Sequence, residues 1–417
     1  MKILKLSTGD IQAGGFIAAY RLLKGLQNIN IDVSMLVQAK STIDDSIVGS
    51  KSPIAKLAAK LRWRLDDMPK ILYPNRKQTM YSLQWMPDFL ISQIEKYNPD
   101  IVHFHWICRG FVNIKTLARI KKPMVWTLHD MWTFTGGCHY DHECGRYRDQ
   151  CGACPQLGSH QEHDLSRGIL QSKHASWNGI QITFVTPSRW LADCARKSAL
   201  LRHQNIQIIP YGLDLNIFFP QEKKVARSNF KLPINGKLIV FGAANGIVDE
   251  RKGFKYLQSA LKILADKQWR SQAIIGLFGD SSAHWLPDLG IPVYFLGKFT
   301  NEESLAQLYS AADIFVAPSV QDNLPNTVME AMACGTPVVA FNIGGMPDMI
   351  DHQVNGYLSQ PYEADDLASG IAWVLEDEKR HQILCQQARK KCEESFFIEM
   401  QSQRYLTLYN NMLNERH

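Results

Sequence analysis

The chain has 417 residues, more than a single hydrophobic core usually serves, so its length favours two domains of about 200 residues each. Hydrophobic residues make up 45% and charged residues 21%, a globular composition that excludes a disordered protein, and no apolar run reaches the roughly 18 residues that span a bilayer. The net charge of +6, without any nucleic-acid-binding motif, favours anionic small molecules or an anionic membrane surface, and we expect no nucleic-acid partner.

The first residues do not resemble a secretion signal. Met1 leads directly into a strand-like run, where a signal peptide has a charged segment followed by an apolar core. We therefore expect a cytoplasmic protein.

Short apolar runs alternate with longer helical patterns in the first half of the chain, which is typical of a parallel sheet with crossover helices. The first run leads through a glycine turn at 9–15 into a helical stretch at 16–26, an order that places backbone N–H groups where an anion or a sugar binds. The glycine spacing differs from the dinucleotide fingerprint, so a tight turn without a ligand is an equally good interpretation. Strands are predicted at 2–6, 32–37, 101–105, 125–128 and 183–186.

Residues 51–77 form a basic stretch with eight basic and two acidic residues. Apolar residues, among them Leu57, Leu61 and Trp63, are interspersed with the charges. The pattern predicts either a solvated helix that covers the first domain or a basic amphipathic surface that contacts the inner face of a membrane.

A cysteine-rich insertion occupies 137–155. Its spacing, C-x5-C-x6-C-x2-C, ends in a CxxC knuckle and can supply four thiolates to one tetrahedral zinc ion. Disulfides and free thiols are the alternatives, although a reducing cytosol disfavours disulfides, and His139 or His142 could replace one thiolate. The predicted ligands of a structural zinc are Cys138, Cys144, Cys151 and Cys154.

The second half of the chain restarts the same strand-helix alternation. Between the two series, residues 208–220 contain two prolines and a glycine, which break regular structure and place the domain boundary near residue 212. We expect domains at 1–211 and 212–395, with a C-terminal helix at 396–417 returning to the first domain. Two such Rossmann-like domains would face each other across a cleft outside the carboxyl ends of their strands. Strands are predicted at 237–242, 273–279, 293–296, 314–317 and 337–341.

The most informative segment is 311–340. It contains two acidic residues eight positions apart, Asp322 and Glu330, and the second begins the run Glu-Ala-Met-Ala-Cys-Gly-Thr-Pro-Val. This segment resembles the donor-binding segment of the family-4 retaining glycosyltransferases of the GT-B fold. The likeness continues through Gly344-Gly345 and Asn355-Gly356, and the Asp-Asn-Leu-Pro-Asn sequence at 322–326 is most similar to the bacterial exopolysaccharide branch of colanic-acid type.

The resemblance implies a role for each residue of this segment. Glu330 would accept hydrogen bonds from the donor's ribose hydroxyls, and Asp322 would face the hexose hydroxyls together with backbone N–H groups at Asn323 and Leu324. The helix that opens near Thr327 would direct its positive end at the diphosphate. The alternatives are a capping box formed by Thr327 and Glu330, and a solvated loop acid at Asp322, where the family usually has Glu followed by Phe-Gly.

Lys252 matches the family's lysine-glycine element, whose ammonium neutralises the departing diphosphate. The family usually has an arginine five positions earlier, where this chain has Ile247. Arg251 could supply the second positive charge, and an exposed Arg-Lys pair without a ligand is the alternative.

In the first half, His129 ends a strand and resembles the family's histidine that faces the transferred sugar, since a neutral imidazole can donate to a hydroxyl. A core histidine is the alternative. Gly14 and Gly15 match the loop that approaches the donor phosphates. His103 and His105 share one face of their strand, and we assign them no role.

The function implied is transfer of a hexose-type sugar, with retention, from a nucleoside-diphosphate sugar to a glycan or a lipid-linked glycan in polysaccharide biosynthesis. No Asp-x-Asp site is evident, so catalysis should need no metal and no other cofactor. His129, Lys252 and Asp322 are the candidate catalytic residues. The alternatives are a nucleotide-sugar epimerase of the same fold and a degenerate sugar-nucleotide binding protein.

Overall fold

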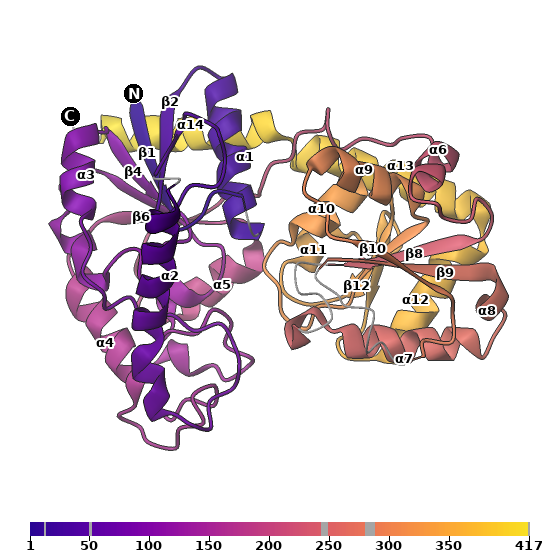
Figure 1. The fold of residues 1–417 in the computed structure, drawn as a ribbon, viewed down its shortest axis with the longest axis horizontal. Helices are drawn as coiled ribbons and strands as arrows, with labels where there is room; N and C mark the ends of the chain where they lie inside the picture. The colour runs from indigo at the N-terminus through magenta and orange to yellow at the C-terminus, as the bar shows by residue number, and fades with distance from the viewer. Residues whose placement is uncertain (12–13, 50–51, 243–248, 280–287, 416–417) are drawn as a thin grey trace. The chain divides into compact units, whose positions relative to one another are not determined.

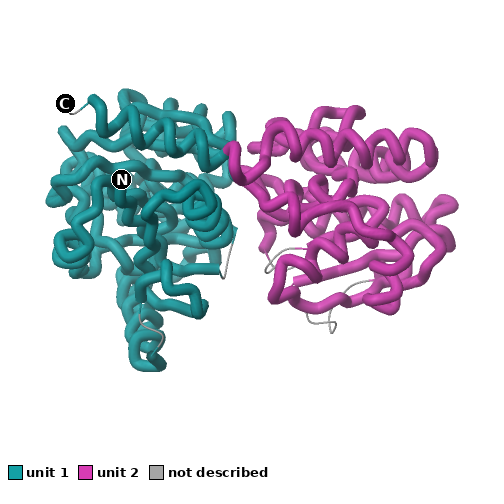
Figure 2. The backbone as a smooth tube through the Cα atoms, turned by 90° about the horizontal axis from the view of Figure 1, so that it is seen from above, with its two compact units in different colours: residues 1–211, 401–417 teal, residues 212–400 magenta. Residues whose placement is uncertain are grey.

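The computed structural model describes residues 1–11, 14–49, 52–242, 249–279 and 288–415. They form two compact units, residues 1–211 with 401–417 and residues 212–400, coloured separately in Figure 2. The division between the units thus falls between Tyr211 and Gly212 and again after Met400.

Unit 1 is built on a parallel sheet of seven strands in the order β3-β2-β1-β4-β5-β6-β7 (Figure 1). Its strands are β1 (Lys2–Ser7), β2 (Asp32–Val37), β3 (Ile47–Val48), β4 (Ile101–Phe104), β5 (Met124–Thr127), β6 (Ile182–Thr186) and β7 (Ile206–Ile208). Its helices are α1 (Gly14–Asn28), α2 (Pro53–Asp67), α3 (Leu90–Tyr97), α4 (Leu165–Trp177), α5 (Arg189–Lys197) and most of α14 (Ile398–Asn414), with short 3-10 helices at Met68–Leu72, Ile114–Arg119, Trp132–Phe134 and Arg146–Arg148.

Two cores cover the two faces of this sheet because successive strand side chains point to opposite sides. Ile3, Val33 and Val125 face the layer of α1 and α14, where Tyr405 and Tyr409 are buried. Leu4, Val102 and Trp126, with Phe104 and Phe184, face the opposite layer. Both faces of the sheet are therefore covered.

Unit 2 has a parallel sheet of six strands in the order β10-β9-β8-β11-β12-β13. Its strands are β8 (Lys237–Gly242), β9 (Ala273–Phe278), β10 (Val293–Gly297), β11 (Ile314–Ala317), β12 (Val338–Phe341) and β13 (Gly356–Ser359). Its helices are α6 (Lys223–Asn229), α7 (Phe254–Ala265), α8 (Trp269–Gln272), α9 (Glu302–Ala311), α10 (Asn326–Ala333), α11 (Met346–Met349), α12 (Ala364–Glu376) and α13 (Glu378–Ser395), with a 3-10 helix η5 (Glu250–Lys252).

The strand order of unit 2 reverses direction between β8 and β11. In sequence order along the sheet it is the 3-2-1-4-5-6 arrangement of doubly wound folds, which bind ligands beside the carboxyl ends of the strands at such a switch point. Unit 1 has the corresponding point between β1 and β4. Both units are thus Rossmann-like, and the predicted fold class is confirmed.

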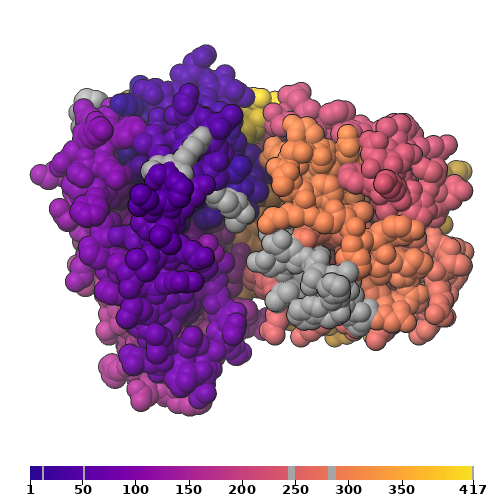
Figure 3. Space-filling model, viewed as in Figure 1, coloured from indigo at the N-terminus to yellow at the C-terminus, as the bar shows by residue number. Residues whose placement is uncertain are grey.

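Helix α2 contributes almost nothing to the core of unit 1. Among its residues only Asp66 is buried, and this carboxylate accepts backbone N–H groups from Leu83, Gln84 and Trp85. The helix is therefore fixed at one end, while its apolar side chains lie on the surface; Figure 3 shows this dark violet segment on the viewed face of unit 1.

Candidate active site

One candidate site lies at the switch point of unit 2. Lys252 and Arg251 belong to η5, which follows β8, and Asp322 lies in the loop that follows the neighbouring strand β11. Because the carboxyl ends of parallel neighbours lie at one edge of a sheet, residues 70 positions apart in the sequence come into contact here.

The carboxylate of Asp322 is the centre of this cluster. The Nζ atom of Lys252 lies 2.7 Å from Asp322 Oδ2, and a guanidinium nitrogen of Arg251 lies 3.2 Å from the same oxygen. Arg251 also donates to the carbonyl of Gln321 and pairs with Asp249. The structure thus brings Lys252, Arg251 and Asp322 together. Asp322 is not a solvated loop acid, and Arg251 and Lys252 are not an exposed pair.

The electrostatics of Asp322 follow from this pairing. Burial acts to raise the pKa of its carboxyl group, but Lys252 and Arg251 outweigh it and hold the pKa at about 2. The side chain is only 8% exposed. Asp322 is therefore ionised at neutral pH and can accept hydrogen bonds from hydroxyl groups.

Glu330 lies on α10, the helix that begins just beyond this loop. Its carboxylate is 3% exposed and accepts a hydrogen bond from the hydroxyl of Tyr309, 3.1 Å away. The helix begins at Asn326 after Pro325, with no side-chain cap, so Thr327 lies within the first turn. The capping box that was the alternative for Thr327 and Glu330 is wrong, because Thr327 does not occupy the cap position.

The loop of Asp322 is packed tightly from two sides. The backbone N–H of Asn323 donates to Asp322 Oδ1 at 3.0 Å, and Leu324 is buried. After β12, the N–H of Gly345 donates to the carbonyl of Asp322, and a β-carbon on Gly344 would lie 2.1 Å from that oxygen. Gly344 also has φ +55°, so this close approach requires glycine.

Unit 1 has a candidate site of its own, which centres on His129, two residues after the end of β5 at Thr127. Its Nδ1 is 2.6 Å from the hydroxyl of Tyr211, and its Nε2 is 3.0 Å from Nδ1 of His105. A β-carbon on Gly15 would lie 3.3 Å from the His129 ring, so the glycine at the start of α1 adjoins this imidazole. Gly14, the first residue of α1, is exposed.

His129 is held in its neutral form. Burial lowers its pKa to about 4, Asp130 acts in the opposite direction, and the ammonium of Lys5 lowers it further. His103 and His105, which were left without a role, extend the same group: their rings are 4.2 Å apart, and burial lowers the pKa of both. His105 contacts His129, whereas His103 is bonded to Tyr409 and Thr127 and supports α14.

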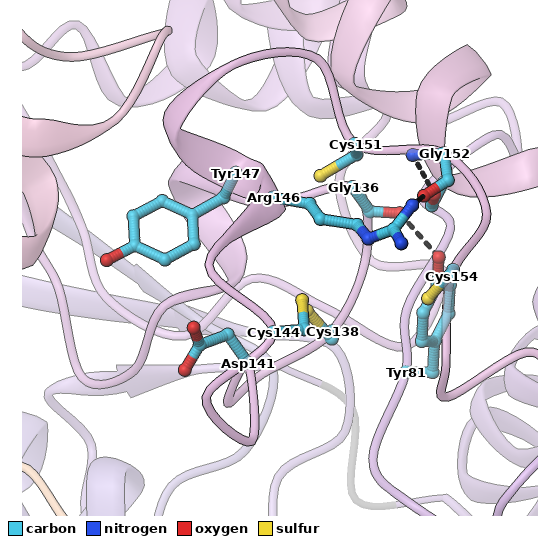
Figure 4. A pocket seen from close by; sticks show the side chains of 11 residues that line it. Tyr81, Gly136, Cys138, Asp141, Cys144, Arg146, Tyr147, Cys151, Gly152 and Cys154 are labelled. Carbon is cyan, nitrogen blue, oxygen red and sulfur yellow. Dashed lines mark hydrogen bonds between the residues drawn. The ribbon is translucent and has the colours of Figure 1, made fainter. Parts of the chain in front are cut away.

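The four cysteines of the insertion line one small cavity of unit 1, about 10 Å³ in volume (Figure 4). All four are free thiols. Within the described residues, no group of three or more His, Cys, Asp or Glu side chains is placed so that it could hold a metal ion. His139 is bonded to Asp130 through Nδ1 and to Ser82 through Nε2, so its ring is engaged elsewhere.

Sequence reasoning missed two tyrosines of the site. Tyr309 orients Glu330, and Tyr211 orients His129. Both are buried, and neither is assigned a role in a site from the sequence. Ile247, at the position of the family's arginine, lies outside the described residues.

Two family models match the chain. The model described as Glycosyltransferase Family 4 matches residues 14–217, and the model described as Glycosyl transferases group 1 matches residues 225–391. The chain belongs to the glycosyltransferases. This glycosyltransferase is 29% identical to an uncharacterized glycosyltransferase of Methanocaldococcus jannaschii, over 73% of each chain.

Solved structures show the same fold over the whole chain. The sucrose-phosphate synthase of Thermosynechococcus elongatus has a TM-score of 0.72 at 19% identity and full coverage of both chains. The Anabaena protein HepE, in complex with UDP and glucose, has a TM-score of 0.64 at 18% identity, covering 98% of this chain and 99% of its own. The glycosyltransferase therefore has the GT-B fold. Among the described residues, no helix is long and apolar enough to cross a membrane.

Proposed function

We propose that the protein transfers a hexose-type sugar from a nucleoside-diphosphate donor, with retention at the anomeric carbon, to a glycan or a lipid-linked glycan. The main support for the proposal is that Lys252 and Arg251 form ion pairs with Asp322 at the switch point of unit 2. Glu330 lies nearby in the sequence. The structurally similar HepE, which has been solved with UDP and glucose, supports a nucleotide sugar as the donor.

Each group in unit 2 has a chemical task in this proposal. Glu330, oriented by Tyr309, accepts hydrogen bonds from the ribose diol. Lys252, with Arg251, stabilises the negative charge that grows on the departing diphosphate oxygen. Asp322 holds both cations and accepts from a hexose hydroxyl, while the first turn of α10, at Thr327, points its N–H groups at phosphate.

In unit 1, we assign neutral His129 to the transferred sugar, to which its ring can donate a hydrogen bond only by giving up one of its two present contacts. Tyr211 and His105 contact its two ring nitrogens and so fix the plane of the imidazole. Retention is consistent with a departing phosphate oxygen that accepts the proton of the acceptor hydroxyl on the same face. This scheme assigns no catalytic task to a metal.

The surface of α2 and of the 3-10 helix Met68–Leu72 supports an acceptor that lies in a membrane. Ile54, Leu57, Leu61 and Leu72 are 79, 67, 54 and 80% exposed, and basic residues are interspersed with them. An apolar surface rimmed by cations has the character of a surface helix that binds anionic lipid. We therefore include peripheral contact with the inner face of the membrane, through residues 53–72, in the proposal.

A donor screen tests the transferase function. Purified protein is incubated with radiolabelled nucleotide sugars, with and without lipid-linked and free glycan acceptors. Acceptor-dependent transfer of label is the expected result. A change in the sugar of the donor without any acceptor would indicate an epimerase, and binding without turnover would indicate a degenerate binding protein.

Vesicle sedimentation tests the membrane contact. Vesicles that contain phosphatidylglycerol should sediment the protein, whereas vesicles of phosphatidylcholine alone should not. Replacement of Leu57 and Leu61 by Ser should abolish sedimentation, with Ile383→Ser on the exposed surface of unit 2 as the matched control. Equal sedimentation of all three proteins would contradict the assignment.

A further inference from the structure

The strongest unassigned feature of the molecule is the cavity of the cysteine-rich segment. We propose that Cys138, Cys144, Cys151 and Cys154 bind one zinc ion as four thiolates, and that this zinc is structural. These four of the nine cysteines line the same cavity, although they are spread over 17 residues of chain. Figure 4 shows their side chains around it, with Arg146 extending towards Gly152.

The segment that surrounds the cavity lacks regular secondary structure. Between β5 and α4, residues 128–164 contain only two three-residue 3-10 helices, yet much of the segment is buried. Irregular segments of this length are uncommon in compact domains unless they are functional or cross-linked. A metal that joins four points of the segment would supply the cross-link.

The knuckle at 151–154 is held in an unusual backbone conformation. Cys151, Gly152 and Ala153 have φ of +56°, +99° and +40° in succession. A β-carbon on Gly152 would lie 2.1 Å from the carbonyl oxygen of Glu162, so only glycine fits at position 152. Conformations of this kind persist where the surroundings enforce them. The chain here is shaped to bring the thiols of Cys151 and Cys154 to one cavity.

The walls of the cavity suit a negatively charged metal site. A zinc ion with four thiolates carries a net charge of −2. Arg146 lines the cavity and donates to the carbonyl of Gly152 at 2.9 Å, and Arg167 donates to the carbonyl of Cys151. The single carboxylate in the lining, Asp141, accepts the backbone N–H groups of Glu143 and Gly145.

The choice of metal follows from the ligands and the space. Soft thiolate ligands select zinc, copper(I) or iron, and four of them in tetrahedral array are typical of structural zinc. The thiols lie around the cavity without yet forming a metal-binding geometry, so zinc binding requires rotation of the cysteine side chains onto the ion. Neither His139 nor His142 lines the cavity, which leaves the four cysteines as the ligand set.

The zinc would affect sugar transfer only indirectly, through the residues that it helps to position. Four thiolates fill a tetrahedral zinc and leave no position for water or substrate. The ordered segment positions His139, whose Nδ1 lies 2.6 Å from Asp130, and Asp130 directly follows His129. Loss of zinc should therefore loosen the support of His129 without removing a reacting group.

Metal analysis of the full chain, purified without added metal, tests the site. We expect about one zinc per chain by elemental analysis, released when p-chloromercuribenzoate blocks the thiols. Cys154→Ser should lower the zinc content by at least fivefold, while Cys385→Ser, in unit 2, should retain it. Cobalt substituted for zinc should give the visible spectrum of tetrahedral thiolate coordination.

Free-thiol counting on unfolded protein separates the alternatives. Nine reactive thiols after chelation, with zinc recovered, fit the proposal. Nine thiols without metal, or fewer than nine because of disulfides, overturn it. Equal zinc in wild type and Cys154→Ser places the metal elsewhere and also overturns it. If Cys154→Ser does not fold, mercurial-driven zinc release from wild type still decides the question.

Discussion

Replacement of Lys252 by Met removes one cation from Asp322 while keeping most of the length of the side chain. The pKa of Asp322 lies near 2, against an ordinary value of 3.8, in spite of the burial that raises it. A difference of almost two pKa units corresponds to about 2 kcal/mol of stabilisation of the charged form. Since Arg251 remains, we expect the free energy of unfolding to fall by about 1–2 kcal/mol.

The effect on catalysis should be larger than the effect on stability. Lys252 is placed to stabilise charge that grows as the diphosphate departs, so kcat should fall on the order of 100-fold while the donor KM changes less. Initial rates at varied donor concentration, measured well below the unfolding temperature, separate the two parameters. Urea unfolding reports the stability.

Lys255→Met is the matched control, because this lysine is exposed on α7 three residues further along the chain. It should leave both kcat and stability unchanged. If Lys252→Met raised only KM, Lys252 would contribute uniform binding, and if it changed neither parameter, the assigned role would be wrong.

Tyr211→Phe leaves Nδ1 of His129 without its hydroxyl partner, so the free energy of unfolding should fall by about 1–3 kcal/mol and turnover should fall as well; unchanged urea unfolding and unchanged rates would contradict this. The folded pKa of Asp322, about 2, lies below the ordinary 3.8, so its contribution to stability is present above about pH 4 and is lost as the pH falls to 2; unfolding measured across this range should depend less on pH in Asp322→Asn, and identical curves would refute the pairing. Glu330→Ala should weaken donor binding by about 1.5–3 kcal/mol in calorimetry, and an unchanged affinity would remove Glu330 from the site.

The sequence predicted most of the sheet strands because buried parallel strands appear as short, nearly continuous apolar runs. The strands at 32–37, 237–242 and 314–317 have the predicted limits. Three edge strands were missed: β3 has two residues, β7 falls at the start of the proline-containing linker, and β13 begins with glycine. Pairing with a neighbouring strand stabilises these three strands, and this pairing cannot be inferred from their local sequence.

For the candidate site residues, the sequence predicted that each one follows a strand. It did not predict which of them contact each other. The contact of Lys252 with Asp322 depends on the pairing of β8 with β11, and the contact of His129 with Tyr211 spans 82 residues. The predicted basic stretch illustrates the same limit. Its composition is compatible with a helix that covers the first domain and with an exposed amphipathic helix. Only the packing in the structure distinguishes these two alternatives, and it shows that almost no side chain of α2 is buried.

In the proposed function, unit 2 binds a nucleoside diphosphate through Glu330 at the ribose and Lys252 at the phosphates. Calorimetry with the preferred nucleoside diphosphate and with the matching nucleoside, which lacks the phosphates, tests both contacts in wild type, Lys252→Met and Glu330→Ala. We expect Lys252→Met to weaken binding of the diphosphate but not of the nucleoside, and Glu330→Ala to weaken binding of both. Equal affinities of the three proteins for the nucleoside diphosphate would contradict both contacts.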